Sequence, residues 1–512
     1  MPIPWNNLGD VIDRSIDPAR PAIVDLRRPD QPVTYSYAEL DRASGGVAHY
    51  LSQAGLPAGA HIAIAALNRI EFIAAYFGIM RAGFVAVPLN IKAGAETLAY
   101  VIADADIQLA FVDGPRRTAL AALVPIVDFD DQGPAGFAAV APPAAFATVP
   151  PAADQVAQML YTSGSTGRPK GVPLTHAGQL WALATIYPPA VPDRQDHYLV
   201  AQPFFHMNGL FVLKRAIAGG ALLVVLPAFD VAPYADALAR YGITHVTAVP
   251  TMFARLVNRP EVLAGRDFSA LQRIALASAP MTVALLDRIQ AAFPAAQIAH
   301  GYGTTEAGPA VFGPHPDGVP TPKLGLGYPL GNAEVRLTGG ATPDDGILQM
   351  RNPAVMHGYH GLPEKNAKVL ADGWYDSGDV MRRDAEGFYY FVGRADDMFV
   401  CSGENIYPGE VEKLIETHPD VRQACVVPLP DEERSQMPVA FVVAREGSAL
   451  TAEAVKHHAL ANGPGYQHPR RVALVAELPW AGTNKVDRHA LLQRARDLEA
   501  RGEWQTHATV RG

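Results

Sequence analysis

The segment Tyr161-Thr-Ser-Gly-Ser-Thr-Gly-Arg-Pro-Lys-Gly171 follows a short apolar run and decides how the rest of the chain is interpreted. It places three glycines and four serine or threonine hydroxyls around a single lysine, Lys170. Glycines let backbone N–H groups approach phosphate oxygens, hydroxyls add hydrogen-bond donors, and the lysine adds positive charge. The segment lacks the Gly-Lys-Ser/Thr ending of a Walker A loop. A Ser/Gly surface turn is the alternative, but this long string favours a polyphosphate-binding loop after a strand.

Two later segments contain the residue types that a nucleotide needs. In Gly301-Tyr-Gly-Thr-Thr-Glu-Ala-Gly308, the tyrosine between glycines is suited to stack on a purine, and the threonines and carboxylate suit phosphate and Mg²⁺. In Trp374-Tyr-Asp-Ser-Gly-Asp379, a loop carboxylate is suited to accept hydrogen bonds from ribose hydroxyls. Each segment alone is also compatible with an ordinary structural turn.

Two more segments lie near the C-terminus. Residues 393–412 join a charged turn to a glycine-containing loop and then to an amphipathic helix. The segment Gly482-Thr-Asn-Lys-Val-Asp-Arg488 presents a lysine in a polar loop, a position that is normally just solvated.

Length and composition restrict the class of protein. The 512 residues include 49% apolar and 18% charged residues, which fits a large buried core and argues against disorder. The net charge of −9 gives no basic footprint for nucleic acid. Two cysteines cannot form a disulfide framework. The N-terminus does not resemble a signal peptide and no apolar stretch of ~20 residues is present, so we expect a cytoplasmic protein without a membrane span.

The hydrophobic pattern predicts an α/β fold. Apolar runs such as 85–88 and 107–112 alternate with helical segments, one of which begins with a capping box at Ser36–Glu39. A Pro- and Ala-rich connector over 133–153, through which no helix can run, leads into a second α/β block. A region dense in Gly and Pro indicates a β-rich lobe, and the last ~115 residues indicate a small α+β domain.

In this order, the five segments resemble those of the adenylate-forming superfamily of acyl-CoA synthetases, carrier-loading adenylation domains and luciferases. The resemblance spans nearly the whole chain, and residues 398–408 and 483–488 are similar to those of 4-chlorobenzoate and 4-hydroxybenzoate CoA ligases. It implies an N-terminal AMP-binding domain over 1–395 and a mobile C-terminal domain over 396–512, with a hinge at Asp396.

The resemblance also implies a two-step reaction with ATP, Mg²⁺ and coenzyme A. A carboxylate attacks the α-phosphate of ATP to give an acyl-adenylate and pyrophosphate, and the thiol of CoA then displaces AMP after the C-terminal domain rotates. Loading of a separate carrier protein is the second choice of acceptor, and a luciferase-type oxidation is the third. The alternative from a different class of protein is a nucleotide-binding regulatory homologue that has lost catalysis. The oligomeric state is not decided by the sequence, and a homodimer is one possibility.

Carried over by position, the nucleotide residues have separate roles. Lys485 would reach the bridging and carboxylate oxygens during adenylation, Tyr302 would stack on adenine, and Asp379 and Arg394 would bind the ribose. Thr305 would contact the α-phosphate, and Glu306 would hold Mg²⁺ together with Thr166. The remaining members of the nucleotide and phosphate site are Thr162, Ser163, Gly164, Ser165, Gly167, Lys170, Gly303 and Thr304.

The acid and thiol residues follow from the same resemblance. His206 would lie near the nascent adenylate, and the loop Ser402-Gly403-Glu404 would line the thiol tunnel after rotation. The chain has Ala277-Ser278-Ala279-Pro280 where many relatives have Gly-Gly-Ala-Pro, so the added volume favours a compact acid. The predicted acid pocket comprises Phe205, His206, Met207, Ser278, Ala279, His300 and Gly301.

Overall fold

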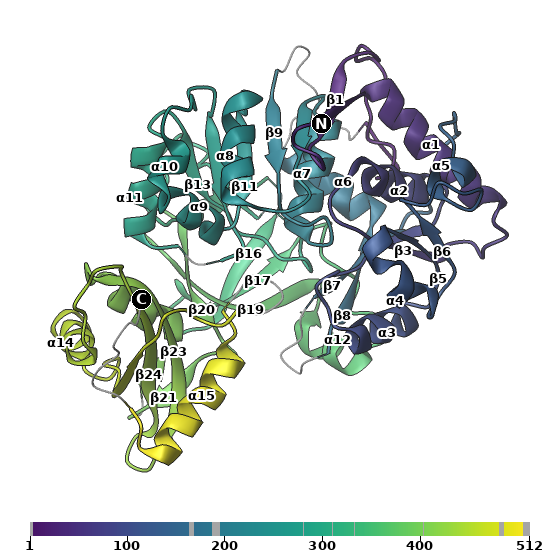
Figure 1. Cartoon of the computed structure of the whole chain (residues 1–512). Coiled ribbons are helices and arrows are strands. Elements are labelled where there is room, and N and C mark those ends of the chain that lie inside the picture. The colour runs from purple at the N-terminus through teal and green to yellow at the C-terminus, as the bar shows by residue number, and fades with distance from the viewer. Residues whose placement is uncertain are drawn as a thin grey trace.

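The computed structural model describes residues 4–162, 168–186, 195–279, 281–309, 311–331, 333–402, 404–480 and 486–504. Its elements form two large, mainly parallel sheets, a β-rich lobe and a small C-terminal unit (Figure 1). This is the α/β architecture that the sequence predicts. Within the described residues, no helix is both long and apolar enough to cross a bilayer.

The first large sheet has six strands in the order β6-β5-β3-β4-β7-β8, parallel except for the β7–β8 hairpin. The strands predicted over 85–88 and 107–112 are present with these bounds. The strands are β3 (His61–Ala65), β4 (Val85–Pro88), β5 (Ile107–Val112), β6 (Ile126–Asp128), β7 (Val156–Thr162) and β8 (Lys170–Thr175). The helices are α1 (Tyr37–Gln53), α2 (Ile70–Arg81), α3 (Ala95–Asp104), η1 (Gly114–Arg116), α4 (Arg117–Ala121), α5 (Phe137–Val140) and α6 (His176–Ile186).

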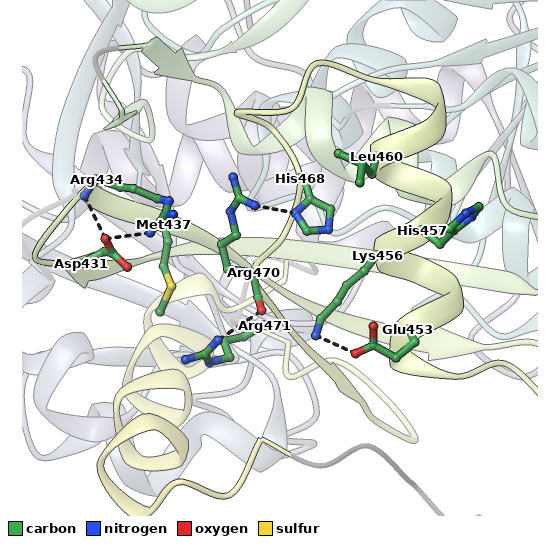
Figure 2. A pocket seen from close by; sticks show the side chains of 10 residues that line it. All are labelled: Asp431, Arg434, Met437, Glu453, Lys456, His457, Leu460, His468, Arg470 and Arg471. Carbon is green, nitrogen blue, oxygen red and sulfur yellow. Dashed lines mark hydrogen bonds and ion pairs between the residues drawn. The ribbon is translucent and has the colours of Figure 1, made fainter.

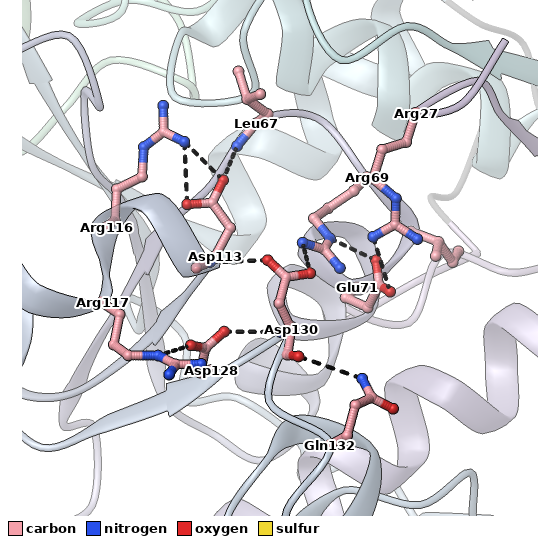
Figure 3. Close-up of polar contacts among 12 residues, drawn as sticks. Arg27, Leu67, Arg69, Glu71, Asp113, Arg116, Arg117, Asp128, Asp130 and Gln132 are labelled. Atoms are coloured by element: carbon pink, nitrogen blue, oxygen red, sulfur yellow. Dashed lines mark hydrogen bonds and ion pairs between the residues drawn. The ribbon is translucent and has the colours of Figure 1, made fainter.

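Local chemistry explains how two of these helices begin. Ser36 and Glu39 form the predicted capping box of α1, with each side chain bonded to the other residue's backbone N–H. Arg69, at the start of α2, is buried and binds Glu71 and Asp130 at 2.7 and 2.8 Å (Figure 3). Asp130 also accepts a hydrogen bond from the N–H of Gly114, so one carboxylate ties the loop after β6 to α2.

The second large sheet has seven strands in the order β13-β12-β11-β9-β10-β1-β2. One face packs on α8, α9 and α11, and the other packs on α7. The strands are β1 (Pro21–Asp25), β2 (Val33–Ser36), β9 (His197–Val200), β10 (Leu222–Val225), β11 (His245–Ala248), β12 (Arg273–Leu276) and β13 (Gln297–His300). The helices are α7 (Met207–Ala218), α8 (Val231–Arg240), α9 (Pro250–Val257), α10 (Pro260–Leu263) and α11 (Val283–Ala292).

The Pro- and Ala-rich stretch over 133–153 contains only the four-residue α5 and otherwise no helix or strand, as the prolines predict. It does not separate two sheets, however. β7 and β8, which follow it, join the first sheet, while β1 and β2 from the N-terminus join the second.

The β-rich lobe is built from antiparallel strands. A five-stranded sheet has the path β16-β17-β19-β18, with β20 paired to β19. Its members are β16 (Glu334–Gly339), β17 (Asp345–Arg351), β18 (Leu370–Ala371), β19 (Trp374–Arg383) and β20 (Tyr389–Arg394), with the small pair β14 (Phe312–Gly313) and β15 (Tyr328–Pro329) and the helix α12 (Pro363–Val369).

The C-terminal unit is set apart beside this lobe (Figure 1). Its sheet has the path β22-β21-β24-β23, with β25 parallel to β24. The strands are β21 (Phe399–Cys401), β22 (Glu404–Ile406), β23 (Val421–Asp431), β24 (Ser435–Ala444) and β25 (Arg471–Leu474), and the helices are α13 (Pro408–Glu416), α14 (Ala452–Asn462) and α15 (Arg488–Arg501).

Candidate nucleotide, acid and thiol site

Three of the predicted nucleotide residues meet at one point. Asp379 on β19 is the register partner of Arg394 on β20, and Arg394 Nη1 donates to Asp379 Oδ1 at 2.7 Å. Tyr302, from the loop after β13, donates its hydroxyl to Asp379 Oδ2 at 2.5 Å. Arg394 also donates to the carbonyl of Ser377 at 2.7 Å. Gly378 has φ +66°, and a Cβ there would lie 2.9 Å from Arg394 Nη2, so glycine is required beside the guanidinium.

The electrostatics of this group are strongly coupled. Burial raises the pKa of Tyr302 well above its ordinary value, and the Asp379 carboxylate raises it further. Burial lowers the pKa of Arg394, but Asp379 more than compensates, so the net direction is upward. The Asp379 side chain is therefore held between a neutral phenol and a guanidinium cation.

A second group surrounds Glu306. The carboxylate accepts a hydrogen bond from the Tyr359 hydroxyl at 2.9 Å, and its backbone carbonyl accepts one from Met356 N at 2.7 Å. Lys170 Nζ lies 4.3 Å from the centroid of the Tyr359 ring, a cation–π contact. Burial lowers the pKa of Lys170, and the positive charge of Lys365 lowers it further.

The loop 301–308 has a tight turn at its centre. Thr304 Oγ1 accepts a hydrogen bond from Ala307 N at 3.0 Å, and Thr304 N donates to the Gly308 carbonyl at 3.0 Å. A Cβ on Gly303 would lie 2.4 Å from the Pro309 carbonyl, so this position accepts only glycine. Thr305 lies partly exposed in the turn, next to the buried Glu306.

Several predicted residues lie outside the described part of the chain: Ser163, Gly164, Ser165, Thr166, Gly167, Gly403 and Lys485. The ends of the first loop are defined, because Thr162 and Lys170 are register partners in the β7–β8 hairpin. Tyr161, one residue before the end of β7, donates to Asp104 at 2.6 Å. Residues 480 and 486 pair on either side of the lysine loop.

The predicted acid residues come from two elements. His206 is the N-cap of α7, with its ring 4.6 Å from that of Phe205 and Met207 buried behind it. At the end of β12, Ser278 has φ +69°. A Cβ on Gly301 would lie 3.3 Å from that of Ala277, so the ends of β12 and β13 are close on one face.

Of the predicted acid residues, His300 contacts the Ala279 backbone, to which its ring is hydrogen-bonded. Its Nδ1 lies 3.1 Å from the Leu324 carbonyl, and its register partner Leu276 is in the core on the opposite face of the sheet from Ala277. Burial lowers the pKa of His300. The ring therefore packs behind the strand rather than facing Gly301.

The predicted hinge lies between the lobe and the C-terminal unit, and the predicted thiol loop lies within that unit, after β21. Asp396 is 67% exposed, with Oδ2 3.5 Å from Arg394 Nη2. Ser402 has φ +54°, and its N–H donates to the Arg434 carbonyl at 3.0 Å. Glu404 is exposed at the start of β22.

A cavity of about 590 Å³ lies in the C-terminal unit (Figure 2). Its lining is mainly basic: Arg434, Lys456, His457, His468, Arg470 and Arg471, with Asp431, Met437, Glu453 and Leu460. Arg470 Nη1 lies 3.0 Å from His468 Nδ1, and Lys456 pairs with Glu453 at 2.9 Å.

Sequence reasoning missed Tyr359, Tyr375 and Lys365. Tyr359 and Glu306 are 53 residues apart, and no local pattern predicts that contact. The only signal is the Gly358-Tyr359 pair, because Gly358 has φ +140°, which a side chain rarely adopts. Burial and then the Glu306 charge raise the pKa of Tyr375, which places its hydroxyl beside the same group.

Comparison with known proteins agrees with this geometry. Residues 14–360 match the family model of the AMP-binding enzymes, and residues 410–485 match that of their C-terminal domain. Feruloyl-CoA synthase of Amycolatopsis sp is 32% identical over 468 residues, or 88% of this chain and 92% of that protein.

Two solved structures are similar over nearly their full length. ATP-bound MatB from Rhodopseudomonas palustris has a TM-score of 0.86 at 28% identity, covering 96% of this chain and 99% of that one. The o-succinylbenzoate CoA synthetase from Bacillus subtilis, in complex with the acyl-adenylate intermediate OSB-AMP, has a TM-score of 0.82 at 26% identity, with 95% and 97% covered.

Fold and site together define an adenylate-forming enzyme with separate AMP-binding and C-terminal domains. The chain belongs to the family of AMP-binding enzymes. It is a ligase of the acyl- or aryl-CoA type, which acts through an acyl-adenylate and uses ATP and CoA as substrates.

Proposed function

We propose that this enzyme activates a compact carboxylic acid with MgATP and transfers the acyl group to CoA. The observation that carries the proposal is the group formed by Tyr302, Asp379 and Arg394. It offers an aromatic ring that suits the base of a nucleoside, and a carboxylate, fixed by two donors, that suits the ribose hydroxyls. A regulatory protein without catalysis would not need Lys170 and Glu306 beside it.

The chemistry requires charge neutralisation before bond formation. Attack of a carboxylate on ATP brings two anions together, and preorganised cations lower this barrier. In this proposal Lys170 faces the β- and γ-phosphates, Thr305 contacts the α-phosphate, and Lys485 completes the site from the C-terminal domain. His206 lies at the acid end, where it controls the route of the thiol.

The residues present fit a shared Mg²⁺ site. Mg²⁺ prefers hard oxygen ligands and usually keeps waters and substrate phosphates in its shell. Glu306 supplies such an oxygen, and the described residues contain no cluster of three or more metal-binding side chains. The donor set therefore suits an ion carried by ATP rather than one held by the protein alone. Thr166 is the second proposed ligand.

The basic cavity of the C-terminal unit supports CoA as the acceptor. CoA carries phosphates, and the cavity gathers Arg470, His468 and Lys456 on one side of the C-terminal sheet (Figure 2). We place the acceptor's phosphates there, with Ser402 and Glu404 along the path of the thiol. A reducing compartment such as the cytoplasm suits the two free, buried cysteines.

The test is pyrophosphate release with MgATP across benzoates, hydroxycinnamates, short aliphatic acids, dicarboxylates and medium fatty acids, with and without CoA. CoA-dependent turnover on one class, abolished by EDTA, is the expected result. A single burst without CoA-dependent turnover would indicate a carrier protein as acceptor. No pyrophosphate with any acid would contradict the proposal.

A half-reaction experiment tests the assignment of Lys485. We expect Lys485→Ala to lower the adenylation rate by at least ~100-fold, since a removed transition-state charge typically costs that much. Thioester formation from supplied acyl-adenylate should persist, because that step does not use the lysine. Equal loss of both half-reactions would contradict this role.

A further inference from the structure

A partly exposed stripe runs along α7. Asn208, Phe211 and Arg215 are spaced by three and four residues, so they share one face of the helix. The residues between Phe211 and Arg215 are buried, including Lys214, whose ammonium donates to Gln179 at 2.8 Å within the core. Asn208 Oδ1 is a buried acceptor that has no hydrogen-bond partner in the described structure.

The sheet surface next to this stripe is also open. Thr247, Ala275 and Ala299 are partly exposed at the centres of β11, β12 and β13, although α7 packs against β11. The alternating positions, such as Val246 and Ile274, are buried on the other face. Small side chains in the middle of a sheet, left uncovered by the helix beside them, leave space for a ligand.

The far end of this surface is cationic. The Arg215 guanidinium lies 5.5 Å from the centroid of the Tyr198 ring, and that ring stacks on His245 at 5.2 Å. Arg273 is the register partner of His245, so both point to the same face. Burial lowers the pKa of Arg273, and the positive charge of Arg215 lowers it further, in line with the placement of both guanidinium groups on this face.

Arg273 is half-buried, and no described carboxylate forms an ion pair with it. A described acidic side chain nearby, Asp196, lies 3.8 Å from His245 Nδ1. Arg273 is therefore a partly buried cation able to take an added anion, and arginine is the side chain best suited to bind a carboxylate or sulfonate through two parallel bonds.

The near end of the surface is the proposed acid-activating end. Ala277 and Gly301 lie close together there, directly after the ends of β12 and β13, and His206 is the N-cap of α7. From Arg273 to Ala277 the strand spans about 13 Å, and from His206 to Arg215 the helix spans about the same length. A compact acid lying along α7 therefore reaches from the adenylation site to the two extended arginine side chains.

We propose that Arg215 and Arg273 bind a second anionic group at the distal end of the acid, so that the substrate is a compact carboxylic acid with a distal carboxylate or sulfonate. This inference rests on the proposed function, and it assigns both arginines as specificity-determining residues. Asn208, two residues after His206, supplies an acceptor near the adenylation end of the same path.

The experiment compares matched acids that differ at one end: terephthalate or 4-sulfobenzoate against 4-methylbenzoate, and glutarate against pentanoate. We expect pyrophosphate release to favour the dianionic acid of at least one pair. Arg273→Met and Arg215→Met should lower kcat/KM for that acid by roughly 10- to 100-fold, the effect expected for a lost charge-assisted bond. The neutral acid and the KM for ATP should change little. Arg240→Met, at an exposed position on α8, is the matched control.

Preference for the neutral acids, or an unchanged ratio in both variants, would overturn the inference. If a methionine variant fails to fold, Arg273→Lys and Arg215→Lys replace it, and a loss of preference is still expected because lysine cannot form the paired bonds. If no acid releases pyrophosphate, the proposed function fails instead. The inference is then decided by thermal shifts with terephthalate, 4-sulfobenzoate and glutarate: stabilisation of the unmodified enzyme but not of Arg273→Met supports it, and no difference overturns it.

Discussion

At the scale of single residues, the charge on Lys170 depends on its neighbours. The ammonium is partly buried against the Tyr359 ring and lies near a second cation, Lys365 on α12. Both effects disfavour the protonated form, because burial removes water and a like charge repels. A phosphate-binding lysine must be protonated to act, so the alkaline limit of adenylation should report its pKa.

We predict that Lys365→Gln shifts this limit to higher pH. Removing the neighbouring positive charge raises the pKa of Lys170, so the lysine stays protonated to a higher pH. The measurement is kcat/KM for ATP from pH 6 to 11 by pyrophosphate release. Lys368→Gln, an exposed change on the same helix, is the control and should leave the profile in place. A shift to lower pH would contradict the assignment.

Ser278 is a second residue for which we predict an effect on function, because of its backbone conformation. Its left-handed φ costs a non-glycine residue about 1 kcal/mol, and it carries a side chain at the end of β12. The free energy of unfolding of Ser278→Gly should stay within about 1 kcal/mol of that of the unmodified enzyme. Relief of the backbone strain offsets the added conformational entropy of the unfolded chain.

The same change should broaden the acid range, because it removes side-chain volume at the predicted pocket. We expect kcat/KM for longer acids to rise relative to short ones. Ser278→Val is the opposing control: a β-branched residue at this φ should lower the free energy of unfolding and narrow the acid range. An identical acid profile in both variants would place Ser278 outside the pocket.

At the scale of elements, an ion pair holds α15 on the C-terminal sheet. Arg488 donates to Glu412 through two bonds of 2.6 and 2.8 Å, and it donates a third to the Val426 carbonyl at 2.8 Å. Glu412 lies on α13, so the guanidinium joins both helices to β23. A bidentate pair in a partly buried site is worth more than an exposed one.

Arg488→Met should therefore lower the free energy of unfolding by about 2 kcal/mol, as expected for loss of charge-assisted bonds. Urea denaturation with a spectroscopic signal from the C-terminal domain measures this change. Arg501→Met breaks the well-exposed pair with Glu503 in the same domain and should cost less than about 1 kcal/mol. Equal costs for the two variants would show that the Arg488 pair adds nothing beyond a surface contact.

The elements also show how far local sequence determines this fold. The capping box at Ser36 and the strands over 85–88 and 107–112 could be predicted, because capping and hydrophobic period are local properties. Membership of the sheets could not, since β1 and β2 pair beside β10 about 200 residues later. Such pairing depends on long-range packing and leaves no mark within one segment.

Some residues of the site could also be predicted from the sequence, and others could not. Tyr302, Asp379 and Arg394 stand in strings long enough to be found from the resemblance, and the structure brings their side chains together. His300 belongs to one of those strings, yet its ring turns to Leu324, because strand alternation places it opposite Gly301. The contact of Tyr359 with Glu306 needed the fold itself.

At the scale of the whole molecule, contacts between α13 and β20 link the C-terminal unit to the β-rich lobe. Lys413 Nζ donates to the Phe391 carbonyl at 3.2 Å, and Tyr407 packs closely over Gly393. Strand β20 of the lobe ends at Arg394 and the next strand, β21, begins at Phe399, so Asp396 lies in the segment between the two sheets. A short exposed segment of this kind is suited to absorb a domain rotation.

We predict that Asp396→Pro slows thioester formation at least ~10-fold while adenylation persists. Proline fixes φ near −65° and restricts the preceding residue, so a backbone that must change its dihedrals between steps is held in one state. No backbone hydrogen bond from Asp396 N is present in the described structure, so the substitution removes no donor that the fold uses. Single-turnover pyrophosphate release and acyl-CoA formation measure the two steps separately.

The control separates rotation from the carboxylate itself. Asp396 Oδ2 lies 3.5 Å from Arg394 Nη2, an exposed pair worth little to stability. Asp396→Ala removes that charge but leaves φ free, so both half-reactions should continue near their original rates. If the alanine variant loses thioester formation as strongly as the proline variant, the carboxylate acts through Arg394, and the segment is not a hinge. If neither variant affects either step, Asp396 only caps a turn. Selective loss in the proline variant alone follows from rotation about this residue, because only that change restricts the backbone.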